Sequence, residues 1–302
     1  MRVGRLRGGG AAVALLLALA GCGSGLPAGV DGTLVDDWPA LPTLTTFTPK
    51  AGTCHASFAD SGPRDSYAPV PCTRPHRTET VQVGTFTGDA AGTAAPPTRS
   101  SPAHAAAYAV CDQAARAYLG RDFRYGRLWL GVTVPSSPAW AGGARWYRCE
   151  LGQVANVEDF GELVDRSESL EGALESPSPL DLTCYQVTAT AAGAISRMAP
   201  MGCTAKHNSE FVGVFAAPAS LAYPKSGDDW EKLHTRCRAV VAAYAKVPND
   251  ANLRYRTGTV AVPNTEDDWT SGNRGVRCYL YVNAGSFTRS LRGVGVKGLP
   301  ER

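Results

Sequence analysis

The stretch Cys72-Thr-Arg-Pro-His76-Arg-Thr-Glu79 recurs in the second half of the chain as Cys203-Thr-Ala-Lys-His207-Asn-Ser-Glu210. The recurrence extends to the cysteines, because eight of the nine fall into two sets of four with similar intervals. The first set is Cys54, Cys72, Cys111 and Cys149, and the second is Cys184, Cys203, Cys237 and Cys278. The chain is therefore predicted to hold two copies of one unit, over residues 52–176 and 182–297.

Each copy is predicted to contain one amphipathic helix that carries the third cysteine of its set. Apolar side chains recur at the i, i+3, i+4 and i+7 positions, which share one face of a helix. These side chains are Cys111, Ala114, Ala115 and Tyr118 in the first copy and Cys237, Val240, Val241 and Tyr244 in the second. The helical cysteine should therefore face the core of its copy.

Strands are predicted on both sides of this helix. Apolar, β-branched and aromatic runs without a helical period occupy 80–86, 130–135 and 145–151 in the first copy and 211–215, 257–263 and 276–282 in the second. With one earlier strand, each copy has the order β-β-α-β-β. We expect the fold class α+β, with two tandem disulfide-stapled domains, each a small antiparallel sheet packed on one main helix. A loop rich in small residues, 87–103, precedes the first helix, and its counterpart is 216–227.

The amino-terminal segment is typical of a bacterial lipoprotein signal peptide. Arg2, Arg5 and Arg7 precede a ten-residue apolar run, which is too short for a membrane-spanning helix of about 20 residues. The string Leu19-Ala20-Gly21-Cys22 matches the lipobox, whose cysteine is lipidated and becomes the new amino terminus. We expect a signal peptide over 1–21, a lipidated tether over 22–51, and a protein anchored to the cell membrane on its extracytoplasmic side.

Net charge argues against nucleic acid as a partner, and the cysteine content predicts disulfides. Residues 1–21 hold three of the 30 basic residues and no acidic residue, so the remaining chain carries 27 basic and 27 acidic residues. A formally neutral chain without a block of Lys or Arg is not expected to bind nucleic acid. Export places the cysteines in an oxidising compartment, where eight regularly spaced thiols predict four structural disulfides.

Four cysteines allow three pairings in each copy, and their positions alone leave all three open. We favour pairing the first with the second and the third with the fourth. The later bond would then join the helix to the last strand, while the earlier bond would close a short loop. Each bond would add about 3–4 kcal/mol to the free energy of unfolding in the chain-entropy model.

The strongest candidate for chemistry is the His-x-x-Glu pair, which occurs as His76/Glu79 and His207/Glu210. An imidazole and a carboxylate can share a proton, contact a partner or supply two ligands to a metal. Zinc takes three or four protein ligands and the nearby cysteines are assigned to disulfides, so no metal is predicted. We favour a structural role in the turn after the cysteine over partner binding, and both over metal binding or catalysis.

A second repeated motif, Trp-x-x-Gly-x-Arg, places Trp140 with Arg145 and Trp269 with Arg274 before the last cysteine of each copy. An indole and a guanidinium can stack on a sugar or hold a carboxylate of a wall polymer. The same side chains can instead cover the disulfide and bond loop carbonyls, which is the interpretation that we favour. All four side chains are candidates for partner binding.

Signatures of common enzymes are missing from the sequence. It contains no G-x-S-x-G, S-x-x-K or H-E-x-x-H motif. Eight paired cysteines and a lipidated Cys22 leave no thiol to act as a nucleophile. We therefore expect a protein that is not an enzyme and uses no cofactor.

Taken together, these motifs make the chain similar to the septum formation family of actinobacterial envelope proteins. The family's domain has a cysteine, then Cys-x-x-Pro-His-x-x-Glu, a helical cysteine, and Trp-x-x-Gly-x-Arg before a final cysteine. The first copy matches with Cys72, Pro75, His76 and Glu79, whereas Lys206 replaces the proline in the second. The resemblance implies a place in the envelope and a link to division septa, and it implies no established reaction.

Three functional hypotheses remain open. The leading one is a non-catalytic, membrane-anchored envelope lipoprotein that binds an envelope protein, a division protein or a wall polymer. The second is a lipoprotein that binds peptidoglycan or another glycan through Trp140, Arg145, Trp269 and Arg274. The third, which we favour least, is an envelope hydrolase that uses the two His/Glu pairs.

Overall fold

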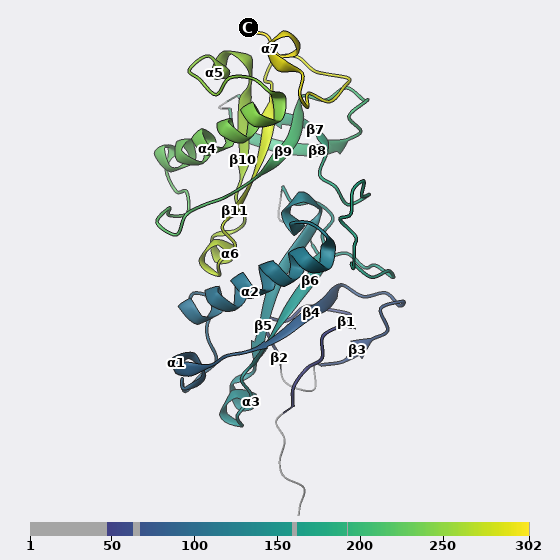
Figure 1. Ribbon diagram of the computed structural model, residues 1–302, viewed down its shortest axis with the longest axis vertical. Coiled ribbons are helices and arrows are strands. Elements are labelled where there is room, and N and C mark those ends of the chain that lie inside the picture. The colour runs from purple at the N-terminus through teal and green to yellow at the C-terminus, as the bar shows by residue number, and fades with distance from the viewer. Residues whose placement is uncertain (1–46, 63–66, 159–161, 192, 302) are drawn as a thin grey trace, which may run out of the picture. The chain divides into compact units, whose positions relative to one another are not determined.

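Two sheets, each covered by one long helix, make up the described part of the chain (Figure 1). The computed structural model describes residues 47–62, 67–158, 162–191 and 193–301. The chain divides into Met1–Thr45 and Thr46–Arg302, and the described residues all belong to the second part. The predicted signal peptide, Cys22 and most of the tether lie outside the described residues. No helix in the described ranges is long and apolar enough to cross a membrane.

The first half, residues 47–181, holds a six-stranded sheet in the order β2-β5-β6-β4-β1-β3. All neighbouring strands are antiparallel except β2 and β5, which are parallel. Its elements are β1 (Thr53–His55), β2 (Ser61–Gly62), β3 (Pro69–Val70), β4 (Thr78–Thr85), α1 (Gly88–Ala91), α2 (Pro102–Leu119), the 3-10 helix η2 (Phe123–Tyr125), β5 (Leu128–Pro135), α3 (Ser137–Ala141) and β6 (Trp146–Gln153).

The second half, residues 182–301, holds a five-stranded antiparallel sheet in the order β10-β11-β9-β7-β8. Five strands of the first sheet follow the same order, so β10, β11, β9, β7 and β8 correspond to β5, β6, β4, β1 and β3. The elements are β7 (Cys184–Ala189), β8 (Ile195–Met201), β9 (Ser209–Ala216), α4 (Gly227–Ala245), α5 (Leu253–Arg256), β10 (Gly258–Val262), α6 (Glu266–Thr270), β11 (Gly275–Tyr281) and α7 (Gly295–Gly298).

The two long helices begin with side-chain caps and bury one face on their sheets. Ser101 accepts a hydrogen bond from the backbone of His104 at the start of α2, and Ser226 forms a capping box with Asp229 at the start of α4. The predicted helical face is the buried one, since Cys111 and Cys237 are both fully enclosed. Both helices contact the central strands of their sheets (Figure 1).

Disulfides form at the pairs that the sequence analysis favoured. Cys54 bonds to Cys72 and Cys184 to Cys203, and each bond closes the short segment that carries β3 or β8. Cys111 on α2 bonds to Cys149 on β6, and Cys237 on α4 bonds to Cys278 on β11. The later bond of each half therefore fastens its helix to its sheet.

The predicted order of elements was incomplete, although the α+β class is confirmed. Each half has an additional strand between its first two cysteines, β3 or β8, so the shared order is β-β-β-α-β-β. The loop 87–103 also contains the short helix α1. The division into domains at 52–176 and 182–297 stays a prediction, because both halves belong to one compact part of the chain.

The two halves share a hydrophobic cluster where they meet. Tyr279 and Phe211 lie on the face of the second sheet opposite α4, because they alternate along their strands with residues that face the helix. They pack in one cluster with Val154 and Val157 of the first half. Tyr125 of η2 stacks edge to face on Phe211, with ring centroids 5.4 Å apart. This junction is the second place, besides the helix-covered cores, where apolar side chains are buried.

Candidate functional site: two buried glutamate networks

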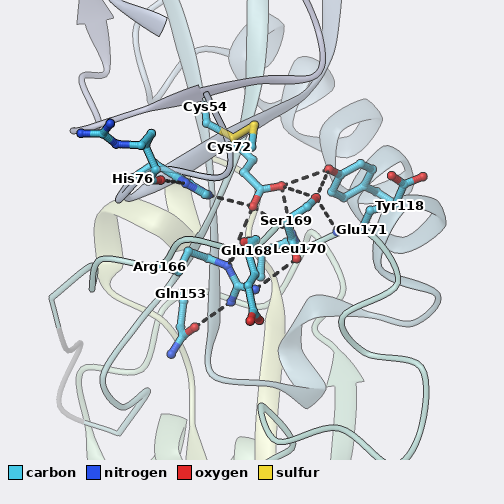
Figure 2. Close-up of polar contacts among 12 residues, drawn as sticks. Cys54, Cys72, His76, Tyr118, Gln153, Arg166, Glu168, Ser169, Leu170 and Glu171 are labelled. Atoms are coloured by element: carbon cyan, nitrogen blue, oxygen red, sulfur yellow. Dashed lines mark hydrogen bonds and ion pairs between the residues drawn. A yellow bond between two sulfur atoms is a disulfide. The ribbon is translucent and has the colours of Figure 1, made fainter. Parts of the chain in front are cut away.

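Glu79, near the start of β4, accepts hydrogen bonds from two distant segments of the first half. Its two carboxylate oxygens lie 2.8 and 3.0 Å from the backbone nitrogen of Leu170, and one lies 3.1 Å from Oγ of Ser169. The hydroxyl of Tyr118, on α2, donates to the carboxylate at 3.0 Å. Figure 2 shows Tyr118, Ser169 and Leu170 converging on this point. One carboxylate thus joins the sheet, the helix and the segment that follows the last strand.

His76 completes this network from the turn after Cys72. Its Nε2 lies 3.1 Å from Oε1 of Glu79, and its Nδ1 lies 2.8 Å from the carbonyl oxygen of Arg74. A carbonyl oxygen only accepts, so Nδ1 carries a proton and Nε2 is the atom that faces the carboxylate. The backbone of His76 also exchanges two hydrogen bonds with the backbone of Arg166. Both the backbone and the ring of this histidine are therefore fully engaged.

The second half repeats the network with nearly the same distances. Nε2 of His207 lies 3.1 Å from Oε1 of Glu210, and Nδ1 lies 2.8 Å from the carbonyl oxygen of Ala205. Glu210 accepts from the backbone of Leu291 at 2.8 and 3.0 Å, from Ser290 at 3.1 Å and from Tyr244 at 2.9 Å. The proline-to-lysine difference at Lys206 therefore leaves the geometry of the turn intact.

The donor set of these networks does not fit a metal site. Cys54, His76 and Glu79 place ligand atoms within 4.8 Å of one another, as do Cys184, His207 and Glu210. Metals bind cysteine as a thiolate, however, and both sulfurs are committed to disulfides. Each cluster is left with one imidazole and one carboxylate, and these already bond to each other.

Burial supports the structural role of the His/Glu pairs, which the sequence analysis favoured over contact with a partner. His76 and His207 are 0% exposed, and Glu79 and Glu210 are at most 2% exposed. Every one of these side chains is engaged within its own half. Their role as partner-binding residues stays a prediction, and a partner could reach these side chains only if the fold opened.

The Trp-x-x-Gly-x-Arg motif holds the loop that precedes the long helix of its half. Trp140 is buried and donates from Nε1 to the carbonyl oxygen of Thr93 at 2.7 Å. Arg145 lies over the Trp140 ring, 4.1 Å from its centroid, and donates to the carbonyl oxygens of Ala91 and Trp140 at 2.6 Å each. This is the loop-bonding role that the sequence analysis favoured.

The second copy also holds its loop through the arginine, although the indole nitrogen of Trp269, unlike that of Trp140, has no hydrogen-bond partner among the described residues. Trp269 is 3% exposed and packs in the cluster that contains Cys237 and Cys278. Arg274 stacks on it at 4.2 Å and donates to the carbonyl oxygens of Pro218, Ala219 and Leu221. Both tryptophans are buried and both arginines bond to loop carbonyls within their own half, while glycan binding by these residues stays a prediction.

A buried polar cluster in the first sheet was missed by the sequence analysis. Nε2 of His55 lies 3.0 Å from Nη1 of Arg148 and 3.0 Å from Oγ1 of Thr80, whose hydroxyl donates to Glu150 at 2.6 Å. Arg148 and Glu150 alternate on β6 with Cys149, which faces the helix, so they occupy the opposite face. The sequence signal for this cluster was the polar residue on either side of Cys149. In the second half, the residues on either side of Cys278 are Arg277 and Tyr279.

Burial shifts the titration of this cluster in opposite directions. The pKa of His55 is lowered to about 4, chiefly by burial and then by the positive charge of Arg148. Burial raises the pKa of Glu150, and Arg148 and the Thr80 hydroxyl oppose that rise. His55 is thus neutral at neutral pH and can accept at Nε2 from the guanidinium of Arg148.

The repeated motifs of this chain therefore hold the fold together, and a family model matches the part of the chain that carries them. The model of one family, described as Septum formation, matches residues 51–278. The match runs through both halves, from the first cysteine pair to Cys278, and covers more than half of the chain. No curated protein and no solved structure matches the chain. All four disulfides and both His/Glu pairs lie inside the matched range, and the chain belongs to the septum formation family.

Proposed function

We propose that this protein is a non-catalytic lipoprotein of the cell envelope that acts as an interaction module in septum formation. Family membership supports the link to cell division. The observation that carries the non-catalytic part is the enclosure of His76/Glu79 and His207/Glu210, the strongest candidates for acid-base chemistry. These side chains form their hydrogen bonds with other residues of the fold and are buried, so a substrate cannot contact them.

The proposed location is the extracytoplasmic face of the cell membrane, with a lipid on Cys22. The lipobox Leu19-Ala20-Gly21-Cys22 supports the anchor. The four disulfides support an oxidising compartment, because thiols stay reduced in the cytosol of most organisms. A single signal thus accounts for both the anchor and the disulfides.

We further propose that residues 52–176 and 182–297 are two tandem domains of one design. The shared strand order, the two matched disulfides in each half and the two glutamate networks support this division. A repeated module without a reaction of its own is suited to holding two partners, or two sites of one partner, near the membrane.

Imaging of a fluorescent fusion tests the proposed function. The fusion should concentrate at division septa, and deletion of the gene should delay septation. A Cys22→Ala variant serves as the control for the anchor, because it should leave the membrane while it retains the fold. An even membrane distribution together with normal septation in the deletion strain would contradict the proposal.

The partner is proposed to be an envelope or division protein, and a wall polymer is the alternative. We keep the wall polymer as an alternative because the protein has a cleft lined by polar and aromatic side chains. Crosslinking in intact cells followed by affinity purification should recover a division protein. Retention of the purified protein on isolated peptidoglycan, with no protein crosslinked, would instead favour the wall polymer.

A further inference from the structure

A cleft of about 460 Å³ lies where the two halves meet. Sites for small molecules usually enclose about 300–1,000 Å³, so the volume suits a ligand of modest size. The first half contributes Phe58, Asp60, Arg99 and Trp129, and the second half contributes Asp267 and Arg277. The side chains of the two glutamate networks are not part of this lining.

Arg277 is the buried cation of the cleft. It is 2% exposed, and burial lowers its pKa. Its guanidinium donates to the carbonyl oxygens of Arg124 at 3.0 Å and Leu128 at 3.4 Å, and to Oδ1 of Asn264 at 3.2 Å. Three of its five N–H groups are therefore used, and none of the ion pairs among the described residues includes it.

Two carboxylates, Glu158 and Asp122, lie near enough to Arg277 to affect its pKa, but their hydrogen bonds and ion pairs are with other residues. Glu158 accepts a hydrogen bond from the hydroxyl of Tyr279 at 2.9 Å. Asp122 forms ion pairs with Arg116 at 2.8 Å and Arg124 at 3.2 Å. A buried charge without a paired counter-charge is costly, and a carboxylate entering the cleft would supply the missing partner.

The cleft also holds an acid without an ion pair. Arg99 lies between Asp60, at 3.5 Å, and Asp268, at 3.4 Å, so these two carboxylates share one cation. Asp267 is exposed beside them, and no ion pair in the described part of the chain includes it. The lining thus presents one unpaired cation and one unpaired anion.

Two half-buried aromatic side chains form part of the apolar wall of the cleft. Phe58 and Trp129 stack edge to face, with centroids 4.5 Å apart, and both are half-buried. The indole of Trp129 lies across Gly131, where a Cβ atom would come within 2.0 Å of the ring. Glycine at this position therefore lets the ring lie flat on the strand and fixes the wall in place.

We propose that this cleft binds a short zwitterionic peptide. The peptide carboxylate pairs with Arg277, its ammonium lies beside Asp267, and its side chain packs against Phe58 and Trp129. A simple anion would leave Asp267 without a partner, and a simple cation would leave Arg277 without one. The inference does not depend on a septal location, because it rests only on the lining of the cleft.

Calorimetric titration of the full-length protein tests this proposal. The probes are the dipeptides alanyl-phenylalanine, alanyl-alanine and glycyl-leucine, each also as its carboxyl-terminal amide and as its N-acetyl derivative. At least one unmodified dipeptide should bind, with alanyl-phenylalanine the tightest, and each cap should weaken binding by about tenfold or more. Failure of all three unmodified dipeptides to bind, or equal affinity for the capped forms, would overturn the proposal.

Variants locate the site without disturbing the junction. Asp267→Asn should weaken binding of the unmodified dipeptide by about tenfold and leave binding of the N-acetyl form unchanged, because the removed interaction is the one with the ammonium. Glu266→Gln is the matched control, since this neighbouring acid pairs with Lys225 and does not line the cleft. Equal losses with both variants, or none with Asp267→Asn, would also overturn the proposal.

Discussion

Glu79 and Glu210 show how one side chain can join parts of a domain that are far apart in the sequence. Each carboxylate accepts from a tyrosine of the long helix and from a Ser-Leu segment beyond the last strand. A buried carboxylate with several donors is stable only as long as those donors remain in place. The glutamate of this motif therefore stabilises the folded state, and its replacement should lower the free energy of unfolding.

Replacement of either glutamate by glutamine tests this role. Glu79→Gln and Glu210→Gln keep the shape of the side chain but replace one carboxylate oxygen by an NH2 group. That group would face the hydroxyl and backbone N–H donors that now bond to the carboxylate. We expect each variant to lose about 2–4 kcal/mol of the free energy of unfolding, with similar losses in the two halves. Denaturant unfolding followed by tryptophan fluorescence measures the change.

Glu171→Gln is the matched control, because Glu171 is exposed beside the first network (Figure 2). Its effect should stay within about 0.5 kcal/mol. If Glu79→Gln were as mild as this control, the carboxylate would not be holding the segments together.

His55 makes the stability of the first half depend on pH. Its pKa is about 4 in the folded protein and 6.5 when unfolded, so above pH 6.5 it is neutral in both states and contributes nothing. Between pH 6.5 and about 4 the unfolded chain takes up a proton that the folded one does not. The free energy of unfolding should therefore fall over this window, by up to about 3 kcal/mol.

A His55→Gln variant isolates this contribution. Glutamine can still bond to Arg148 and Thr80 but does not titrate, so its loss of stability between pH 6.5 and 4 should be smaller than that of the parent protein. Glu150 titrates in the opposite sense and is present in both proteins, so it cancels in the comparison. Parallel stability curves for the two proteins would show that His55 is not the titrating group.

At the scale of the elements, the two long helices end in the same left-handed conformation with different residues. Gly120 follows α2 with φ of 83°, and Lys246 follows α4 with φ of 56°. Glycine adopts this conformation without cost, whereas other residues lose roughly 1 kcal/mol. The second half therefore carries a small backbone strain that the first half avoids.

Lys246→Gly should stabilise the protein by about 0.5–1 kcal/mol, because relief of strain exceeds the added freedom of the unfolded chain. The reciprocal Gly120→Ala change should cost about 1–2 kcal/mol, since its Cβ would also lie 2.9 Å from Cγ of Glu175. Chemical denaturation of both variants measures these shifts. A destabilised Lys246→Gly protein would mean that the lysine side chain makes contacts worth more than the strain.

The sequence predicted these elements well where a pattern repeats in both halves. Apolar periodicity predicts the two long helices. Apolar and β-branched runs predict the strands β4, β5, β6, β9, β10 and β11. The disulfide pairing was favoured among three possibilities that the cysteine positions left open. Strand β8 was missed because it is an edge strand with a proline at Pro200 and no buried alternation. Edge strands bury little, so their sequences carry little signal.

The site was predicted in part and for the same reason. Repetition singled out the His-x-x-Glu and Trp-x-x-Gly-x-Arg motifs, but it could not separate a structural role from a binding role. Burial of the His/Glu pairs and of both tryptophans favours the structural role. In the cleft, Arg277 has a counterpart in Arg148 of the first half, but Asp267 falls at the position of Pro138, so a search for repeats could not single out the pair. They come together only when the two halves pack.

At the scale of the whole described part, the junction depends on a glycine. Arg124, from η2, donates from Nε to Oδ1 of Asn273 at 2.9 Å and forms ion pairs with Asp112 and Asp122. Its side chain passes directly over Gly275, where a Cβ atom would lie 2.1 Å from Nε. The first half's Trp-x-x-Gly-x-Arg segment is followed by Trp146 at the position of Gly275. The small residue in the second half is thus explained by the contact with Arg124.

Gly275→Ala should therefore loosen the junction while it leaves the helix-covered cores folded. The added methyl must displace a buried guanidinium that bonds to the opposite half, and we expect a loss of about 1–3 kcal/mol in the free energy of unfolding. Hydrogen exchange should become faster at residues 122–128 and 273–277. It should stay slow in the parts of α2 and α4 that the disulfides of Cys111 and Cys237 fasten to their sheets. Gly202→Ala is the control, because its Cβ would meet open space. If exchange at 122–128 did not change, the side chain of Arg124 would not be coupling the two halves, and their contact would rest on the apolar cluster around Tyr279 and the hydrogen bonds of Arg277.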